Sequence, residues 1–295
     1  MYINNNSMAS NVANNLTSHY SDLATSTQRL STGLRVNSAA DDAAGLAIRE
    51  LMRTDIKALQ QGVRNANDAI SLIQTADGAL GVIDEKLTRM KELAEQASTG
   101  TYDSTQRLMI ESEYQAMASE ITRIANATDF NGIHLLDGNL SGDTHVGNTM
   151  TSTGKMKIHF GTANDSAEDY YYIQIGTSTA SALGVGNETT AGRDGATIST
   201  QEAAQKALVA ITNAVVSKDK IRAHLGALQN RLENTVSNLT TQAENLQAAE
   251  SRISDVDVAT EMTQFVRNQI LTQSSVAMLS QANSMPKMAM QLIGG

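Results

Sequence analysis

The sequence predicts a mainly α-helical fold: a long antiparallel helical coiled-coil bundle. In this fold the chain forms a hairpin that pairs its N- and C-termini, with a small β-hairpin region in the middle. Three observations support this. Apolar residues recur at alternating steps of three and four over long stretches. The single proline is Pro286, so the strongest helix breaker is missing before it. Residues 130–198 are richer in glycine than the segments on either side and contain short β-rich apolar runs.

The first 30 residues predict a helix with a thin apolar seam, flanked mainly by Asn, Ser, Thr and Ala. A matching seam lies between Met262 and Leu279. Two such stripes scarcely offset the roughly 1–2 kcal/mol of backbone entropy lost per ordered residue. We therefore expect both end segments to order mainly when many copies pack together. The N-terminal seam is Val12, Leu16, Tyr20, Leu23, Thr27 and Leu30.

The segment STGLRVNSAADDAAGLAI (31–48) contains adjacent carboxylates, Asp41 and Asp42, among small residues. Small side chains allow close backbone approach, and both carboxylates are suited to cap the helix that follows. A catalytic pair would need a partner acid, base or metal and a cleft, and the sequence identifies none. The segment is therefore interpreted as a packing element.

A very long helix is predicted from Met52 to Ala97, on the order of 70 Å at about 1.5 Å per residue. A second helix follows the break at Gly100, with Asp103 or Ser104 as its cap. The long seam is Met52, Ile56, Leu59, Val63, Ala66, Ile70, Ile73, Ala76, Leu80, Ile83, Leu87, Met90, Ala94 and Ala97.

The middle region contains the runs KMKIHF (155–160) and YYYIQI (170–175), separated by a polar turn, which predict a β-hairpin. A capping box of Ser199 with Glu202 then opens another long helix, whose seam runs from Leu208 to Ile253. Ser254 or Asp255 is expected to cap the last helix.

Composition excludes several functions. A net charge of −9 and a pI near 5.0 argue against a nucleic-acid or anionic-membrane partner. No cleaved secretory signal and no membrane span is expected, and the absence of cysteine fits a cytosolic protein or one exported without disulfides. The five histidines are scattered and none forms an HExxH motif. We expect no catalytic, metal or cofactor site, and no enzyme.

Several long runs resemble bacterial flagellin in the order of that family. They are QRLSTGLRVNSAADDAAGLAIRELMR (28–53), NANDAISLIQTADGAL (65–80), LTRMKELAEQAS (87–98), ATDFNGIHLLDG (127–138) and SRISDVDVATEMTQFVRNQILTQSSVAMLSQAN (251–283). The resemblance implies an inner terminal coiled-coil domain, residues 1–46 and 255–295, that is disordered in the monomer. It also implies a helical core domain, residues 47–254, with the β-hairpin region at about 130–198 and no large outer domain.

The resemblance further implies export through the flagellum's own type III apparatus, so that the protein is secreted and extracellular in the filament. The expected partners are other copies of the chain, the flagellar cap and hook–filament junction proteins, and an export chaperone. In the resembling linker we expect subunit packing by Leu34, Arg35, Asp41, Asp42 and Gly45.

The run LTRMKELAEQ resembles the central motif through which the vertebrate Toll-like flagellin receptor recognises flagellins. The resemblance places Arg89, Leu93 and Glu113 in that recognition patch. Lys91 stands where the motif commonly has Arg, and Lys lacks the bidentate fork.

The sequence thus favours a self-assembling structural subunit of the flagellar filament. The alternatives are a hook–filament junction protein, which shares similar ends, or a secreted α-helical binding module with a stable monomer.

Overall fold

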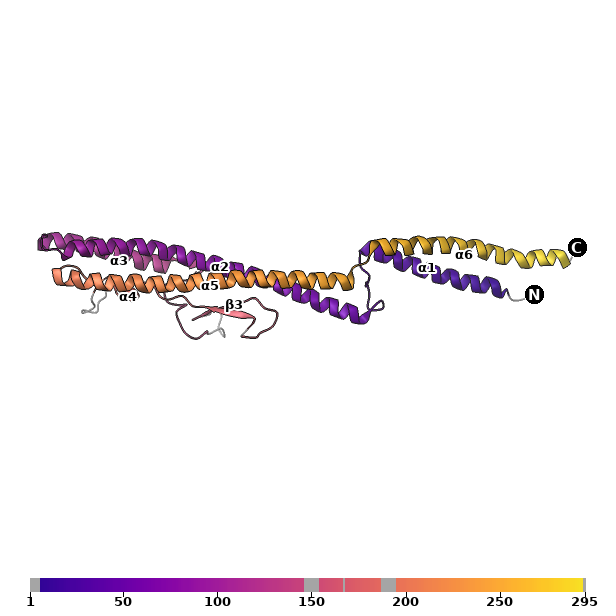
Figure 1. The fold of residues 1–295 in the computed structure, drawn as a ribbon, viewed down its shortest axis with the longest axis horizontal. Helices are drawn as coiled ribbons and strands as arrows, with labels where there is room; N and C mark the ends of the chain where they lie inside the picture. Colours follow the sequence, from indigo (N-terminus) through magenta and orange to yellow (C-terminus); the bar gives the residue numbers. More distant parts are fainter. Residues whose placement is uncertain (1–5, 146–153, 167, 187–194, 294–295) are drawn as a thin grey trace. The chain divides into compact units, whose positions relative to one another are not determined.

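The computed structural model describes residues 6–145, 154–166, 168–186 and 195–293. Within these ranges the chain is mainly helical, and the order of elements follows the predicted path along helices, through a small β region and back along helices (Figure 1). The chain divides into two compact units. The terminal unit comprises residues 1–56 and 244–295, and the core unit comprises residues 57–243.

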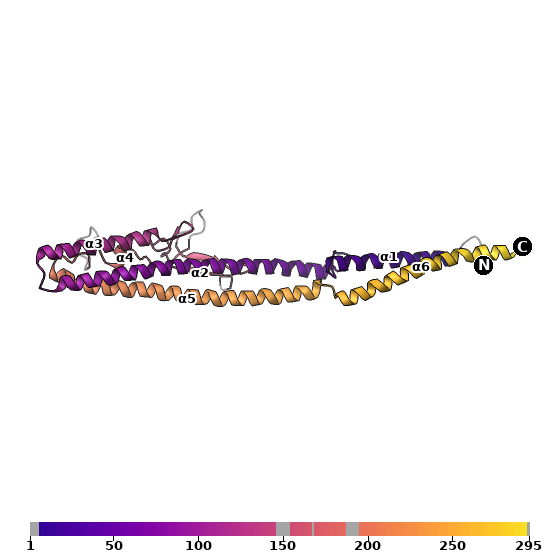
Figure 2. The same cartoon turned by 90° about the horizontal axis from the view of Figure 1, so that it is seen from above.

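In the terminal unit, α1 (Ser7–Thr32) lies beside α6 (Val258–Ile293) (Figures 1 and 2). The Asn6 side chain donates to the carbonyl of Ala282 at 2.8 Å, while Arg29 lies 3.8 Å from Glu261. Because the earlier α1 residue meets the later α6 residue, the helices are antiparallel. The predicted pairing of the chain ends is confirmed.

The packing between α1 and α6 contains few large apolar side chains. Ser26, Glu261, Thr272 and Ala282 are the buried residues of these two helices in the described chain. The predicted seams of the two helices contribute side chains that are only half-buried. They are Val12, Leu16, Leu23 and Leu30 in α1, and Phe265 and Leu279 in α6. The terminal unit therefore gains little stability from burial of apolar surface within one chain.

The core unit is built on three helices, α2 (Ala43–Ser98), α3 (Ser104–Ala127) and α5 (Gln201–Ser254). Helices α2 and α5 are antiparallel, because Asp77 pairs with Arg222 at 2.7 Å and Asp84 pairs with Lys218 at 2.5 Å. Most of the predicted α2 seam is buried, as are Tyr114 and Ile121 of α3 and the following α5 residues: Ile211, Leu225, Leu228 and Leu232. The core unit thus has the continuous apolar core that the terminal unit lacks.

Two short hairpins follow α3. β1 (Asp129–Phe130) pairs with β2 (Ile133–His134), and β3 (Met156–His159) pairs with β4 (Tyr170–Ile173), both antiparallel. The second hairpin confirms the prediction from the runs KMKIHF and YYYIQI. A single-turn helix, α4 (Ala180–Leu183), follows.

Side chains on α2 and α5 attach the second hairpin to the helices. The Asn65 amide donates to the carbonyl of His159 at 2.8 Å, and the Arg231 guanidinium lies 3.5 Å from the centre of the Tyr171 ring. Gly62 completes the contact, because a Cβ there would collide with the carbonyl oxygen of Phe160.

Some predicted helix caps differ from the structure. Asp103 precedes α3 as predicted, and its N–H donates to the Gln106 side chain at 3.0 Å. Thr200 rather than Ser199 accepts the first free N–H group of α5, from Ala203 at 3.2 Å. α5 continues to Ser254, and Asp257 rather than Ser254 or Asp255 caps α6 by accepting from the N–H of Ala259 at 3.0 Å. Neighbouring Ser, Thr and Asp residues have similar capping propensities, so tertiary contacts decide among them.

Candidate assembly surface and linker

Helix α6 exposes a broad apolar surface. In the seam predicted between Met262 and Leu279, four apolar residues face solvent in the single chain: Met262, Val266, Ile270 and Val276. At 100° per residue, Val258, Met262, Val266 and Ile270 cover about a third of the circumference, and the half-buried Phe265 lies at the edge of this face. The exposed fractions lie between 44% and 60% for the set Val258, Met262, Val266, Ile270, Val276, Met278 and Met288.

This distribution reverses the usual amphipathic pattern. The side facing α1 includes Glu261 and Thr272, while large aliphatic side chains face outward. A helix that is apolar on more than one face is stable in water only when other chains cover it. In α1, the large apolar residue Met8 and the aromatic residue Tyr20 are also exposed.

The linker after α1 is held by backbone hydrogen bonds to the junction between α5 and α6. The N–H of Arg35 donates to the carbonyl of Ser254 at 2.7 Å, and the N–H of Val256 donates to the carbonyl of Gly33 at 3.0 Å. Leu34 and Asp255 form an isolated antiparallel bridge between these bonds. The Arg35 guanidinium adds a bond of 2.7 Å to the carbonyl of Ile253. The predicted linker residues Leu34 and Arg35 thus join the two chain segments.

The adjacent carboxylates have different partners, so the prediction that both cap α2 was wrong for Asp41. Asp42 accepts from the N–H of Gly45 at 2.9 Å and caps α2. Asp41 instead closes the preceding turn, accepting from the N–H of Ser38 at 2.8 Å and from the N–H of Asn37 at 3.1 Å. These bonds, the one from Ser38 above all, lower the pKa of Asp41.

Gly45 is required beside the Asp42 cap. A Cβ at this position would collide with the Asp42 carboxylate. Gly45 is also buried, whereas Ala43 and Ala44 next to it are exposed. Only Gly45 among these small residues is therefore needed for close approach within one chain.

Two arginines that the sequence reading did not single out complete this region. Arg49 is buried on α2, where its guanidinium donates to the carbonyl of Val36 at 2.8 Å and pairs with Glu50. Arg53 pairs with Glu250 at 3.0 Å. The sequence around these arginines does not indicate their partners, because the partners depend on how the linker folds back.

The predicted recognition residues are only partly on the surface. Arg89 on α2 donates to Glu113 on α3 at 2.7 and 2.9 Å and to Glu92 at 2.9 Å, and all three side chains are exposed. These carboxylates, Glu113 first, raise the pKa of Arg89. Leu93 is only 1% exposed and packs in the apolar core beneath them. Arg89 and Glu113 therefore form one exposed charged pair, whereas Leu93 is buried in the core.

Comparison with known proteins identifies the family. Residues 3–141 match the model of the bacterial flagellin N-terminal helical region, and residues 208–293 match that of the C-terminal helical region. The chain belongs to the flagellin family. Two curated relatives agree with this over nearly the full length. Flagellin of Bacillus subtilis is 41% identical over 308 residues, covering 99% of this chain and 100% of the relative. A flagellar filament core protein of Brachyspira hyodysenteriae is 40% identical over 293 residues, with the same coverage.

This flagellin is therefore a structural subunit of the bacterial flagellar filament. A solved hook-associated protein of Vibrio parahaemolyticus matches with a TM-score of 0.55, covering 73% of this chain and 100% of that one. At 13% identity this likeness shows the fold alone. The long matches at about 40% identity thus decide for a flagellin over the junction-protein and binding-module alternatives.

In the described part of the flagellin, no three His, Asp or Glu side chains gather closely enough to hold a metal ion. None of the described helices combines the length and the apolar character that a membrane crossing requires.

Proposed function

We propose that this flagellin assembles through its chain ends. Residues 1–46 and 255–295 form the inner layer of the filament and order when neighbouring copies cover the outward face of α6. Residues 47–254 form the surrounding shell, with no large outer domain. The observation that carries this proposal is the exposed apolar surface of α6 on a unit whose own interior holds Ser26, Thr272 and Ala282.

The linker between α1 and α2 determines the path of the chain from the inner layer to the shell. Leu34 and Arg35 bond to the junction between α5 and α6, while Asp41, Asp42 and Gly45 shape the turn into α2. Because these contacts join both ends of the chain, they favour one path for the linker in every subunit of the polymer.

The low stability of the isolated chain ends also suits export. A terminal unit with few buried apolar side chains unfolds at small cost, as passage through the flagellum's narrow type III apparatus requires. The flagellin is then secreted and extracellular. Its exposed α6 surface is the site expected to meet the export chaperone before assembly and the cap and hook–filament junction proteins during it.

The Arg89–Glu113 pair is the proposed contact for a host's Toll-like flagellin receptor. Its two exposed side chains lie on adjacent helices, and the buried Leu93 holds α2 in place beneath them. Charge reversal at Glu113 would remove the pair without disturbing the core, whereas a change at Leu93 would act through packing.

Seeded polymerisation tests the assembly proposal. Purified monomer is mixed with sheared filament fragments of the same protein and sedimented, beside a chain truncated to residues 46–254. The intact chain is expected to pellet as filaments and the truncated one to remain soluble. An intact chain that stays monomeric with seeds would refute assembly through the chain ends.

A point variant sharpens this test. Ile270 is 60% exposed on α6, so Ile270→Ser removes apolar surface without opening a cavity in the single chain. Burial of such a side chain contributes about 1.5–3 kcal/mol, and each 1.4 kcal/mol is tenfold in concentration. The critical concentration should therefore rise about tenfold or more. Ile270→Val is the matched control, expected to raise the critical concentration by no more than about fourfold, because it removes only one CH₂ group.

A further inference from the structure

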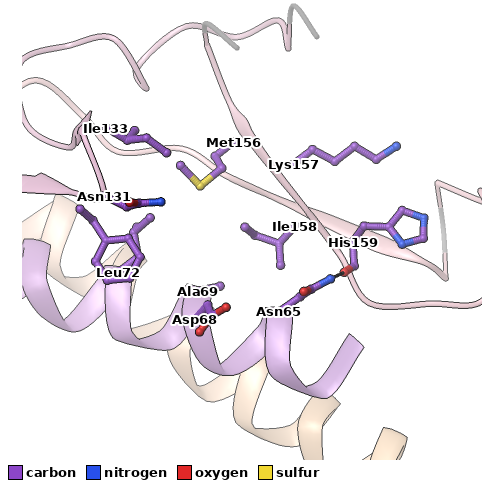
Figure 3. Close-up of a pocket in the computed structure, with 11 residues that line it drawn as sticks. Asn65, Asp68, Ala69, Leu72, Asn131, Ile133, Met156, Lys157, Ile158 and His159 are labelled. Atoms are coloured by element: carbon purple, nitrogen blue, oxygen red, sulfur yellow. Dashed lines mark hydrogen bonds between the residues drawn. The ribbon is translucent and has the colours of Figure 1, made fainter. Parts of the chain in front are cut away.

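An open groove lies in the core unit, between α2 and the two hairpins (Figure 3). Its volume is about 340 Å³, within the range of small-molecule sites. Residues 65–72 of α2 form the floor, and side chains from both hairpins form the walls. The lining includes Asp68, Leu72, Asn131, Ile133, Met156 and Ile158.

The walls of the groove are apolar. Met156 and Ile158 project from β3 toward α2, and Ile133 closes the opposite side (Figure 3). Leu72 is buried beneath them, but Ile133 remains 41% exposed, and Met156 and Ile158 are half-buried. Apolar surface is thus left uncovered in a shape that admits a ligand of side-chain size.

The groove has few polar groups, and the side chains of Asp68 and Asn131 are both exposed to solvent. The carboxylate of Asp68 lies at the floor, and the carboxamide of Asn131 extends toward the same space (Figure 3). Neither side chain makes a hydrogen bond or an ion pair with another residue of the described ranges. Lys157 and His159 also line the groove, but their side chains extend away from α2 (Figure 3). Asp68 is therefore a negative charge with no nearby positive partner inside the groove.

Backbone geometry holds Asn131 in this position. Asn131 has a φ of +52°, the left-handed conformation that Asn tolerates better than most residues. The next N–H group, of Gly132, donates to the Asp129 carboxylate at 3.1 Å and closes the turn between β1 and β2. The amide is thus presented by a fixed turn.

We propose that this groove binds a small organic cation, an ammonium group attached to an apolar body. The ammonium group pairs with Asp68 and donates to the carboxamide oxygen of Asn131, while the apolar body covers Met156 and Ile158. The Asp68 carboxylate would repel an anion, and a neutral ligand would gain no ion pair with it. The chain's net charge of −9 attracts cations to its surface.

Phenethylammonium chloride is a suitable probe, titrated into the full-length monomer with methyl groups observed by NMR. Saturable shifts are expected at Ile133, Met156 and Ile158, with none at Ile211 in the buried core. The uncharged 2-phenylethanol has nearly the same shape and should bind about threefold to fivefold more weakly, as expected for one exposed ion pair.

Substitutions test the role of the charge. Asp68→Asn should weaken phenethylammonium binding to the level of the alcohol, whereas Asp55→Asn, an exposed change elsewhere on α2, should leave it unchanged. Equal binding of the two probes, or unchanged binding by the Asp68→Asn variant, would overturn the proposal.

A variant that blocks the groove tests whether the probe binds there. Ile133→Trp enlarges an exposed side chain at the mouth of the groove, so the helical core should remain intact by circular dichroism. It should abolish the shifts at Ile158. Persistent shifts there, or shifts spread over methyl groups outside the groove, would show that the probe binds elsewhere.

Discussion

Asp42 and Gly45 are coupled because the cap of α2 occupies the space that a Cβ on Gly45 would need. Asp42→Ala should destabilise the terminal unit by about 1 kcal/mol, the usual value of an N-cap. Gly45→Ala should displace the cap at a similar cost but gain about 1 kcal/mol of helix propensity, so its net effect is small. In the Asp42→Ala background, Gly45→Ala should stabilise.

Thermal disassembly of filaments, followed by circular dichroism, measures this order of stabilities. The Asp42→Ala filament should melt lowest, and the double variant should melt above it. If the two substitutions are simply additive, the proposed competition for space is wrong.

The hydrogen bonds of Asp41 should make the stability of the filament depend on pH. Its hydrogen bonds hold its pKa in the folded protein below the unfolded value, which is about 3.9. Its contribution to stability is therefore fully present above that value and is lost as the pH falls through the lower folded pKa. Asp41→Asn should make filament dissociation less sensitive to acid below about pH 4. Light scattering during acid titration checks this, with Asp22→Asn, an exposed change on α1, as control.

At the scale of single elements, two glycines of α2 distinguish the effect of a close packing contact from the effect of helix propensity. Gly62 touches the carbonyl of Phe160, whereas nothing surrounds the position of a Cβ on Gly78. Gly62→Ala should cost about 1–3 kcal/mol by pushing the hairpin of β3 and β4 from the helix. Gly78→Ala should stabilise by up to about 1 kcal/mol. Thermal unfolding of the monomer measures both, and equal effects at the two sites would contradict the close contact.

Helices and hairpins were largely predictable because their patterns are local. The alternation of three and four residues in α2 follows from 3.6 residues per turn, and the seam it predicted is mostly buried. The caps were less predictable, since Ser199 and Thr200 are both good caps and only the contacts of the folded chain select Thr200. For α6, periodicity located the apolar residues but did not say which of them meet α1, because apolar residues lie on more than one of its faces.

At the scale of the whole molecule, the two units should differ in stability. The core unit has a continuous apolar core, whereas the terminal unit does not. Limited proteolysis of the monomer by thermolysin should therefore cut first within residues 1–46 and 255–295 and leave a resistant fragment near residues 57–243. Mass spectrometry identifies the cuts. Assembled filaments should resist the same cleavage, and rapid cutting inside the core unit would contradict this ranking.

The sequence by itself determined the helical class, the antiparallel path, the hairpin and the flagellin family, because these depend on local periodicity and long runs of residues. Only the tertiary structure decided that Asp41 and Asp42 act separately, that Leu93 lies beneath Arg89 and Glu113, and that Asp68 lies in an apolar groove. Each of these depends on segments far apart in the chain. Their contacts arise from packing between elements, which no single stretch of sequence specifies.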